Sequence, residues 1–507
     1  MPIDPRSPCI IGVASRTWHP ETVGPAGAPE PLDMWVDVAT NAADDVGGRA
    51  VLDAVDSVNV VYCQTTQYDD PPARLAERLH ITPTHRFYSG IGGTTAQQLV
   101  ARAAESIIAG DRDVVLITSA EALATQRKAK RAGERLEYAF RPAERRPFPW
   151  EAPLHPAEIA HEVFQAWLTF AVFDNARRAH LGTSLDDYRR AIGETMAPLT
   201  RIAAENPDAW FRNARTVEEI IEPTGANRMV GYPYTKYTVA IMDVDMAAAI
   251  VVASHERADA LNVPDDQRVY LRGWCYATDP VYVAEHRDMW RSPAMAAAGT
   301  EALRTACVTL DDVAHLDLYS CFASSLNFAR DALGIAPDDG RALSVTGGLP
   351  YHGGPGSGYM THSIAQMARE LRADPGSVGL VSGVGMTMTK HAFGVYSTTP
   401  GPIVRPEAER VQAELDAAHP VGITDVWEGH ATVAAYSVVH GRDGGPEWAL
   451  LVCDVDGGHR AYARSTEAEL LDGAETHELV GRTVRLDPVA LDLPTGPARR
   501  NIATLAL

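Results

Sequence analysis

Residues 89–120 read SGIGGTTAQQLVARAAESIIAGDRDVVLITSA, and this stretch contains the pattern that decides the fold. Apolar residues recur at helical spacing over 95–109, and Gly110 follows as a good residue to end a helix. The β-branched run after Asp113 is typical of a strand that is buried on both faces of a sheet. With short strands expected at 8–14 and 57–63, this order predicts a parallel α/β layer.

A similar order of elements returns later in the chain, which indicates an internal duplication. The charged, helix-rich segment 122–238 separates the two sets and predicts an insertion. The second set is expected to contain strands at 268–274, 315–320 and 378–384 and helices from Pro293, at 323–333 and at 362–371. We expect four regions: a first half at 1–121 completed by about 239–264, the insertion at 122–238, a second half at 265–401, and a separate domain at 419–507.

The last region differs from the rest of the chain. After a proline-rich break at 400–406, short alternating segments are separated by glycine turns such as Gly457-Gly458. This pattern predicts a small antiparallel β-barrel of the OB type.

Composition narrows the class of function. The chain has 507 residues, 46% of them hydrophobic and 22% charged, which is ordinary for a folded multidomain protein. The net charge of −21 makes nucleic acid a poor partner. The six cysteines are scattered without a C-x-x-C pair, which argues against a zinc or other metal site and favours the reducing cytoplasm. No apolar run reaches the length of a membrane span.

Over roughly residues 8–400 the chain resembles the thiolase superfamily, particularly the sterol-carrier-protein type. Four anchors carry the resemblance: the stretch 90–113, LYSCFA at 318–323, GGLPYHGGP at 347–355, and GVG at 383–385. The resemblance implies a duplicated thiolase fold of two stacked βαβαβαββ halves. It also implies that 122–238 is the helical loop domain that covers coenzyme A, with an OB-like barrel fused at the C-terminus.

Each anchor fails at the residue that does the chemistry in a thiolase. The positions that match the nucleophilic cysteine, the oxyanion-hole residue, the activating histidine and the second cysteine are Gly93, Tyr319, Gly354 and Gly383. Claisen chemistry needs a thiolate to carry the acyl group and a second group to move a proton. Glycine can do neither, so we expect no thiolase reaction.

Tyr319 and His352 are the candidate catalytic residues. Some thiolase-fold aldolases work without the cysteine, and Tyr319 could supply a base or stabilise an enolate in a retro-aldol step. The alternative is that its ring fills the space left by the original motif. Weaker candidates, each with a packing role as the alternative, are Tyr351, Tyr359 and His391. His362 is expected to be structural, and Cys321 is expected to be a buried core residue.

A basic run suggests the ligand. Residues 127–146 contain eight Arg or Lys against three Glu, a balance of +5 in a chain of net −21. Coenzyme A carries a pyrophosphate and a 3′-phosphate, so clustered cations are its expected partners. The candidate binding residues are Arg127, Lys128, Lys130, Arg131 and Lys236. The alternative is an ordinary solvated helix face.

Three functional hypotheses follow. The first is an acyl-CoA-binding enzyme that acts on acyl-CoA or on steroid or fatty-acyl side chains by non-thiolase C–C chemistry such as retro-aldol cleavage. The second is a catalytically inactive acyl-CoA-binding or partner protein, and the third is the acetyl-CoA acetyltransferase activity of the family name. In each case coenzyme A or acyl-CoA is the ligand, no cofactor is held covalently, and both a dimer and a monomer stay open. Polar side chains that converge on Tyr319 would favour the enzyme, and apolar side chains that fill the old site would favour the inactive binding protein.

Overall fold

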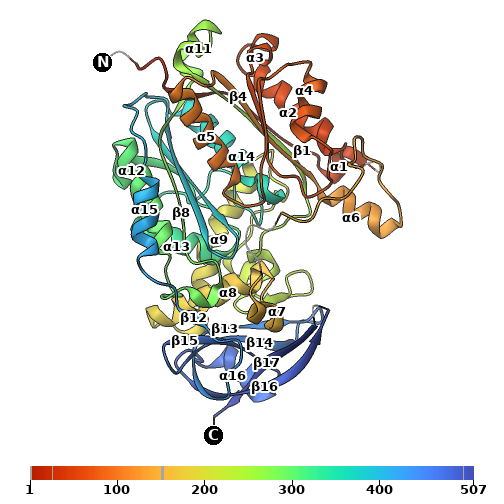
Figure 1. Cartoon of the computed structure of the whole chain (residues 1–507), viewed down its shortest axis with the longest axis vertical. Coiled ribbons are helices and arrows are strands. Elements are labelled where there is room, and N and C mark those ends of the chain that lie inside the picture. The colour runs from red at the N-terminus through yellow and green to blue at the C-terminus, as the bar shows by residue number, and fades with distance from the viewer. Residues whose placement is uncertain (1–2, 25–26, 150–153, 495, 507) are drawn as a thin grey trace.

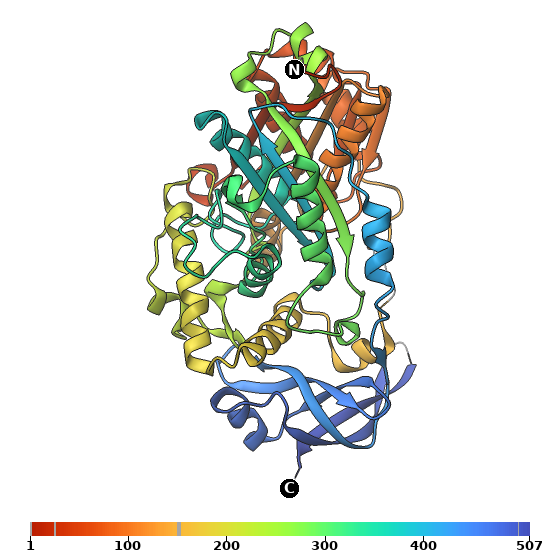
Figure 2. The same ribbon diagram turned by 90° about the vertical axis from the view of Figure 1, so that its left-hand side faces the viewer.

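A computed structural model describes residues 3–24, 27–149, 154–494 and 496–506. The molecule is elongated, with a large α/β body at one end and a β-barrel at the other (Figure 1). The N-terminus lies beside the body, and the chain ends at the far side of the barrel. Helices of the insertion lie between these two parts, as Figure 2 shows from the side.

The body is built on one nine-stranded sheet with the order β3-β2-β4-β7-β1-β8-β11-β10-β9. Its first-half strands are β1 (Pro8–Thr17), β2 (Ser57–Val60), β3 (His85–Tyr88), β4 (Val114–Ala122) and β7 (Asp245–Ser254). Its second-half strands are β8 (Val269–Thr278), β9 (Val313–Asp317), β10 (Val378–Gly385) and β11 (Lys390–Ser397). The two halves meet where Cys9 pairs with Tyr270 and Ile10 pairs with Val269.

The arrangement of strands repeats on either side of this junction. Next to β1 lies the antiparallel strand β7, and next to β8 lies the antiparallel strand β11. Beyond them the outer strands pair in parallel, β4 with β2 and β10 with β9. The duplication expected from the sequence is therefore confirmed. Strands β3 and β11 were not expected.

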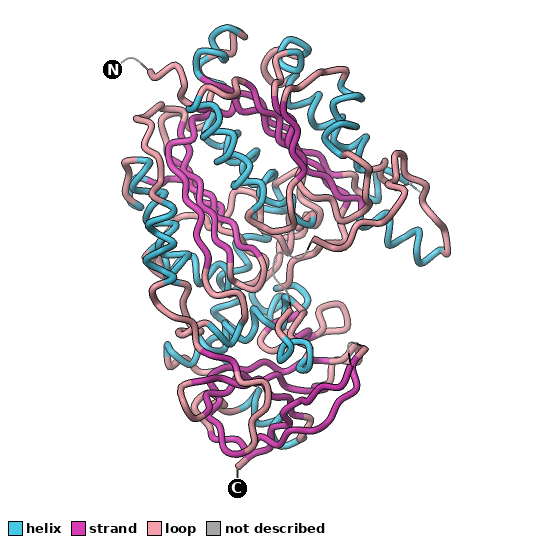
Figure 3. The backbone as a smooth tube through the Cα atoms, viewed as in Figure 1, coloured by secondary structure: helices cyan, strands magenta, loops and turns pink. Residues whose placement is uncertain are grey.

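Helices form the remaining layers of the body. Helices α5 (Thr95–Ala109) and α14 (Tyr359–Ala373) contact each other and strands of both halves, so they form a central layer (Figure 3). On the outer faces, α2 (Pro31–Asp44) packs on the first half and α12 (Pro293–Ala306) on the second. The other helices of the body are α1 (Pro20–Val23), α3 (Arg49–Asp53), α4 (Pro71–Leu79), α11 (His255–Ala260) and α13 (Ala323–Leu333).

The insertion leaves the sheet after β4 and returns at β7. It contains the helices α6 (Leu123–Ala132), α7 (Pro156–His161), α8 (Ala166–Leu181), α9 (Leu185–Glu205) and α10 (Val217–Ile221). It also contains a short hairpin of β5 (Met229–Gly231) and β6 (Tyr234–Thr235). Helices α7 and α8 pack on the barrel.

The C-terminal region is a closed barrel, which follows the linker helix α15 (Ala408–Asp416) and the short strand β12 (Gly422–Ile423). Its strands are β13 (Gly429–His440), β14 (Pro446–Val455), β15 (His459–Ser465), β16 (Thr483–Leu493) and β17 (Gly496–Leu505), with α16 (Ala468–Thr476) after β15. They pair in the order β13-β14-β15-β17-β16 and back to β13. The OB-like barrel is confirmed, but it is not wholly antiparallel, because β15 and β17 pair in parallel at Arg464 and Ile502.

Within the ranges given above, no helix combines the length and the apolar character that crossing a lipid bilayer requires.

Candidate functional site

The insertion contains a cavity of 1470 Å³. One side is formed by α6 and the loop after it, and the other side is formed by residues 211–243. Cationic side chains line it from both sides. They are Arg127, Lys130, Arg135, Arg141, Arg215, Arg228 and Lys236. Two carboxylates, Glu134 and Asp243, also line it, so the cavity has a clear excess of positive charge.

Only some of these cations are neutralised by the protein itself. Arg127 forms an ion pair with Asp243, and Arg135 and Arg141 lie 3.3 and 3.8 Å from Glu137. Within the described part of the chain, no carboxylate lies at ion-pair distance from the other four. These four cations are Lys130, Arg215, Arg228 and Lys236. Because like charges held together repel each other, such a cluster favours an anionic ligand.

The cavity also has an apolar surface. Trp167, Phe211, Val239, Met242 and Pro350 line it together with the cations. Phe211 is 40% exposed and Met242 is 45% exposed. A ligand with both phosphate groups and an alkyl or aromatic part would therefore find both kinds of contact in one place.

The basic residues expected from the sequence divide into two groups. Arg127, Lys130 and Lys236 line the cavity. Lys128 and Arg131 lie on the same helix but do not line it, and Lys128 Nζ is 3.4 Å from the carbonyl oxygen of Gly24. Sequence reasoning missed Arg215 and Arg228, because neither lies in a basic run or a motif.

The position that matches the thiolase nucleophile is filled by another residue. Gly93 lies just before α5, and a Cβ atom built on it would be 2.3 Å from Tyr319 Oη and 2.1 Å from the Val384 carbonyl oxygen. Both distances are far below any van der Waals contact. The ring of Tyr319 therefore occupies the space that a cysteine side chain would need.

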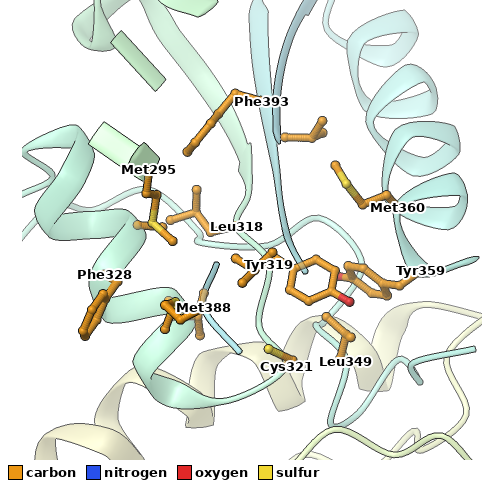
Figure 4. Close-up of a cluster of buried hydrophobic side chains, with 14 of the residues drawn as sticks. Met295, Leu318, Tyr319, Cys321, Phe328, Leu349, Tyr359, Met360, Met388 and Phe393 are labelled. Atoms are coloured by element: carbon orange, nitrogen blue, oxygen red, sulfur yellow. The ribbon is translucent and has the colours of Figure 1, made fainter. Parts of the chain in front are cut away.

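The other two glycine positions also have side chains against them, closely at Gly383 and less closely at Gly354. A Cβ on Gly383 would lie 2.2 Å from Met360 Sδ, and a Cβ on Gly354 would lie 3.2 Å from Leu349 Cδ2. Figure 4 shows Tyr319, Met360 and Leu349 within one buried cluster, with Tyr359 beside Tyr319. The side chains of Tyr319, Met360 and Leu349 thus lie against the old thiolase positions.

Tyr319 itself has no polar partner that could activate it. It is 5% exposed, and burial raises the pKa of its phenol far above the usual range. Within the described ranges its hydroxyl makes no hydrogen bond. The ring meets Tyr359 edge-on at 5.5 Å, and it is the Tyr359 hydroxyl that bonds Thr346 Oγ1 at 2.7 Å and Asp317 at 3.1 Å.

His352 lies deep inside the protein and does not line the cavity. Its Nδ1 is 3.4 Å from the side-chain nitrogen of Asn206, and its ring lies 5.4 Å from His362. Its Nε2 is buried and has no hydrogen-bond partner among the residues that the structure describes. Burial lowers the pKa of His352 to about 4, so the ring is neutral at pH 7. Its neighbour Tyr351 lines the cavity instead.

Two further sequence candidates have packing roles. His391 Nε2 lies 3.0 Å from both Asp279 and Ser292, at the start of α12 and outside the cavity lining. Cys321 is buried, with its Sγ 3.5 Å from Ser325 Oγ.

A wall separates the cavity from the old centre. None of Gly93, Tyr319, Gly354 and Gly383 lines the cavity, whereas Pro350 and Tyr351 do. The adjacent Leu349 accepts a hydrogen bond from the Ile241 amide at 3.3 Å, and the Gly354 amide donates to the Ile241 carbonyl at 2.8 Å. These contacts hold the two segments together between the two sites.

Comparisons with known proteins agree with this fold. The aldolase complex Ltp2-ChsH2(DUF35) is 17% identical, with a TM-score of 0.60 over 78% of this chain and 98% of that chain, and it shows the fold alone. The acetyl-CoA acetyltransferase of Methanothermobacter thermautotrophicus is 25% identical over 216 residues. That alignment covers 38% of this chain and only 54% of that enzyme. The chain is thus a thiolase-fold protein.

A closer match identifies the family. Residues 410–488 match the model of the thiolase-like protein type 1 additional C-terminal domain. A crystal structure of a monomeric SCP2-thiolase-like protein type 1 from Mycobacterium smegmatis is 32% identical, covers 100% of both chains and has a TM-score of 0.85. This chain belongs to the SCP2-thiolase-like proteins of type 1.

Proposed function

We propose that this protein binds coenzyme A thioesters in the basic cavity and does not carry out thiolase chemistry. The observation that supports the proposal is that Lys130, Arg215, Arg228 and Lys236 converge on one cavity. None of these cations has a carboxylate partner among the described residues. A nucleotide with a pyrophosphate and a 3′-phosphate supplies the matching negative charge. The neighbouring apolar lining suits the pantetheine and acyl parts of the same ligand.

The packing of the old centre favours binding without turnover. A retro-aldol step would require Tyr319 to contact the substrate and a base to accept a proton. Tyr319 lies behind the wall of Leu349 and Ile241, without a hydrogen-bond partner within the described ranges. The geometry therefore supports the binding protein more than the aldolase or the acetyltransferase. The relative from M. smegmatis is described as monomeric, and we propose the same state for this chain.

Calorimetric titration with coenzyme A tests the binding proposal. The variant Lys130→Ala/Lys236→Ala should bind about 5- to 30-fold more weakly at low salt, because each exposed charge contributes roughly 0.5–1 kcal/mol. The difference should shrink as salt rises. Arg131→Ala/Arg145→Ala is the matched control, since it removes two exposed cations that do not line the cavity.

Pantetheine, which lacks the nucleotide phosphates and keeps only the apolar contacts, should compete with coenzyme A only weakly in the same titration. Equal affinities for the wild type and the Lys130→Ala/Lys236→Ala variant at low salt would refute the proposed site.

A further inference from the structure

The β5–β6 hairpin belongs to the insertion by sequence but to the barrel by pairing. Gly231 of β5 pairs antiparallel with Val439 of β13, about 200 residues further along the chain. Strand β13 is the first strand of the C-terminal barrel, and β5 and β6 extend its sheet. The barrel therefore makes direct backbone contact with the part of the insertion that borders the cavity.

The same hairpin carries two of the cavity cations. Arg228 precedes β5 and Lys236 follows β6, and the Lys236 amide donates a hydrogen bond to the Arg228 carbonyl at 2.9 Å. Both side chains line the cavity, as does Val230 between them. The backbone of this hairpin thus fixes where the two cationic side chains begin.

Buried hydrogen bonds attach the hairpin to the barrel. The Tyr232 amide donates to the Val438 carbonyl at 2.8 Å, and Ser437 Oγ donates to the Tyr232 carbonyl at 2.9 Å. Asn175 of α8 donates to the same Tyr232 carbonyl at 3.2 Å and to the Tyr436 carbonyl of β13 at 2.9 Å. Ser437 and Asn175 are both fully buried, so these bonds are shielded from water.

The packing at Gly231 shows how close the contact is. A Cβ at this position would lie 2.5 Å from the Trp167 ring and 3.6 Å from Ser437 Oγ. Trp167 lines the cavity. Only glycine allows the hairpin to lie between the barrel and this cavity residue.

We propose that the C-terminal barrel supports one wall of the anion-binding cavity from outside, and that Ser437 of β13 and Asn175 of α8 are positioning residues for Arg228 and Lys236. The inference rests on the proposed function. Two unpaired cations on one hairpin repel each other, so an unsupported hairpin would move them apart. The barrel prevents this movement and keeps the binding wall preorganised before the ligand arrives.

Titrations of full-length variants with coenzyme A test this role. Asn175→Ala/Ser437→Ala leaves the Tyr232 carbonyl without its side-chain partners, and it should weaken binding by about 5- to 30-fold although no cation is removed. Amide exchange at Tyr232 and Lys236 should become faster in this variant. Tyr436→Phe is the matched control, because it removes a buried hydrogen bond from the same strand to Ala474 of α16, at 2.7 Å, and should keep the affinity.

The variant Arg228→Ala/Lys236→Ala separates the two proposals. If it binds as tightly as the wild type, the proposed function fails. If it binds weakly while folded Asn175→Ala/Ser437→Ala binds normally, only the role of the barrel is wrong. Equal weakening by Tyr436→Phe would also overturn that role, because it would show a general loosening of the barrel. Should the double variant not fold, Ser437→Ala alone replaces it, with weakened binding expected and unchanged binding contradicting the proposal.

Discussion

The hydroxyl of Tyr319 lies where the side chain of residue 93 would begin, 2.3 Å from the position of a Cβ on Gly93. The glycine and the tyrosine therefore depend on each other. A side chain at 93 has no room while Tyr319 is present, and the tyrosine ring has no room unless 93 is glycine. The loss of the thiolase nucleophile and the filling of its site are one structural change.

We predict that Gly93→Cys does not restore a thiolase nucleophile and instead destabilises the protein. The new side chain would overlap Tyr319 Oη and the backbone oxygen of Val384. Overpacking of this kind costs about 1–3 kcal/mol of unfolding free energy, measured by urea denaturation.

Gly354→Ala serves as the control for this prediction. Its new Cβ would lie 3.2 Å from the end of the Leu349 side chain, which can shift slightly, and 3.4 Å from the Ile241 carbonyl oxygen, an ordinary contact distance. We expect a much smaller loss of stability. If Gly93→Cys were as stable as the wild type, the packing described for Tyr319 would be wrong.

We predict that His352 makes the protein less stable in acid. Its pKa falls from 6.5 to about 4 on burial, so between these values the unfolded chain binds a proton that the folded chain does not. The free energy of unfolding should therefore decrease as the pH is lowered from about 6.5 to about 4, by roughly 1.4 kcal/mol per pKa unit.

The contribution of His352 can be isolated by comparing slopes. In His352→Gln the unfolding free energy should depend less on pH over this range than in the wild type. His161 and His286, whose pKa values burial also lowers, lie elsewhere in the protein and affect both proteins equally. Identical slopes for His352→Gln and the wild type would contradict the prediction.

We predict that Tyr462→Phe weakens the attachment of the barrel to the insertion. Tyr462 Oη donates to the buried carboxyl of Glu158 at 2.7 Å and accepts from the Ala284 amide at 2.8 Å. Removing the hydroxyl leaves both groups short of a partner, at a cost of about 2–4 kcal/mol in thermal or urea unfolding. Tyr276→Phe is the control, since within the described ranges the Tyr276 hydroxyl makes no hydrogen bond. If Tyr462→Phe were as stable as Tyr276→Phe, the hydrogen bonds of the Tyr462 hydroxyl would not stabilise the protein.

Much of the body could be predicted from local patterns. The helix expected at 95–109 and the one at 323–333 have the bounds that the structure gives to α5 and α13. Both have strong apolar periodicity and a glycine at the C-terminal end. Strand β11 (Lys390–Ser397) was not predicted, because it begins with the polar residues Lys390 and His391. His391 was interpreted as a site residue, although it begins a buried run.

The relationships between distant segments could not be predicted in this way. Nothing in the residues around Gly231 indicates that they pair with Val439. Nor could the sequence show that Arg215 and Arg228 line the cavity, because both lie in parts of the insertion that contain no motif. By contrast, the sequence did offer a packing role for Tyr319, and the structure places the Tyr319 ring against Gly93. The signal for this contact was that one thiolase position carries a large residue while another carries glycine.

Native mass spectrometry of the full-length protein with a panel of acyl-CoA esters tests the central claim most directly. It reports, in one spectrum, whether a complex forms, whether the protein gains a covalent acyl group, and whether the ligand changes mass. We predict a noncovalent complex with intact acyl-CoA and unmodified protein, because the cavity holds unpaired cations while the old catalytic centre is filled by Tyr319, Met360 and Leu349. A covalent acyl adduct, a cleaved product or the absence of any complex would contradict it.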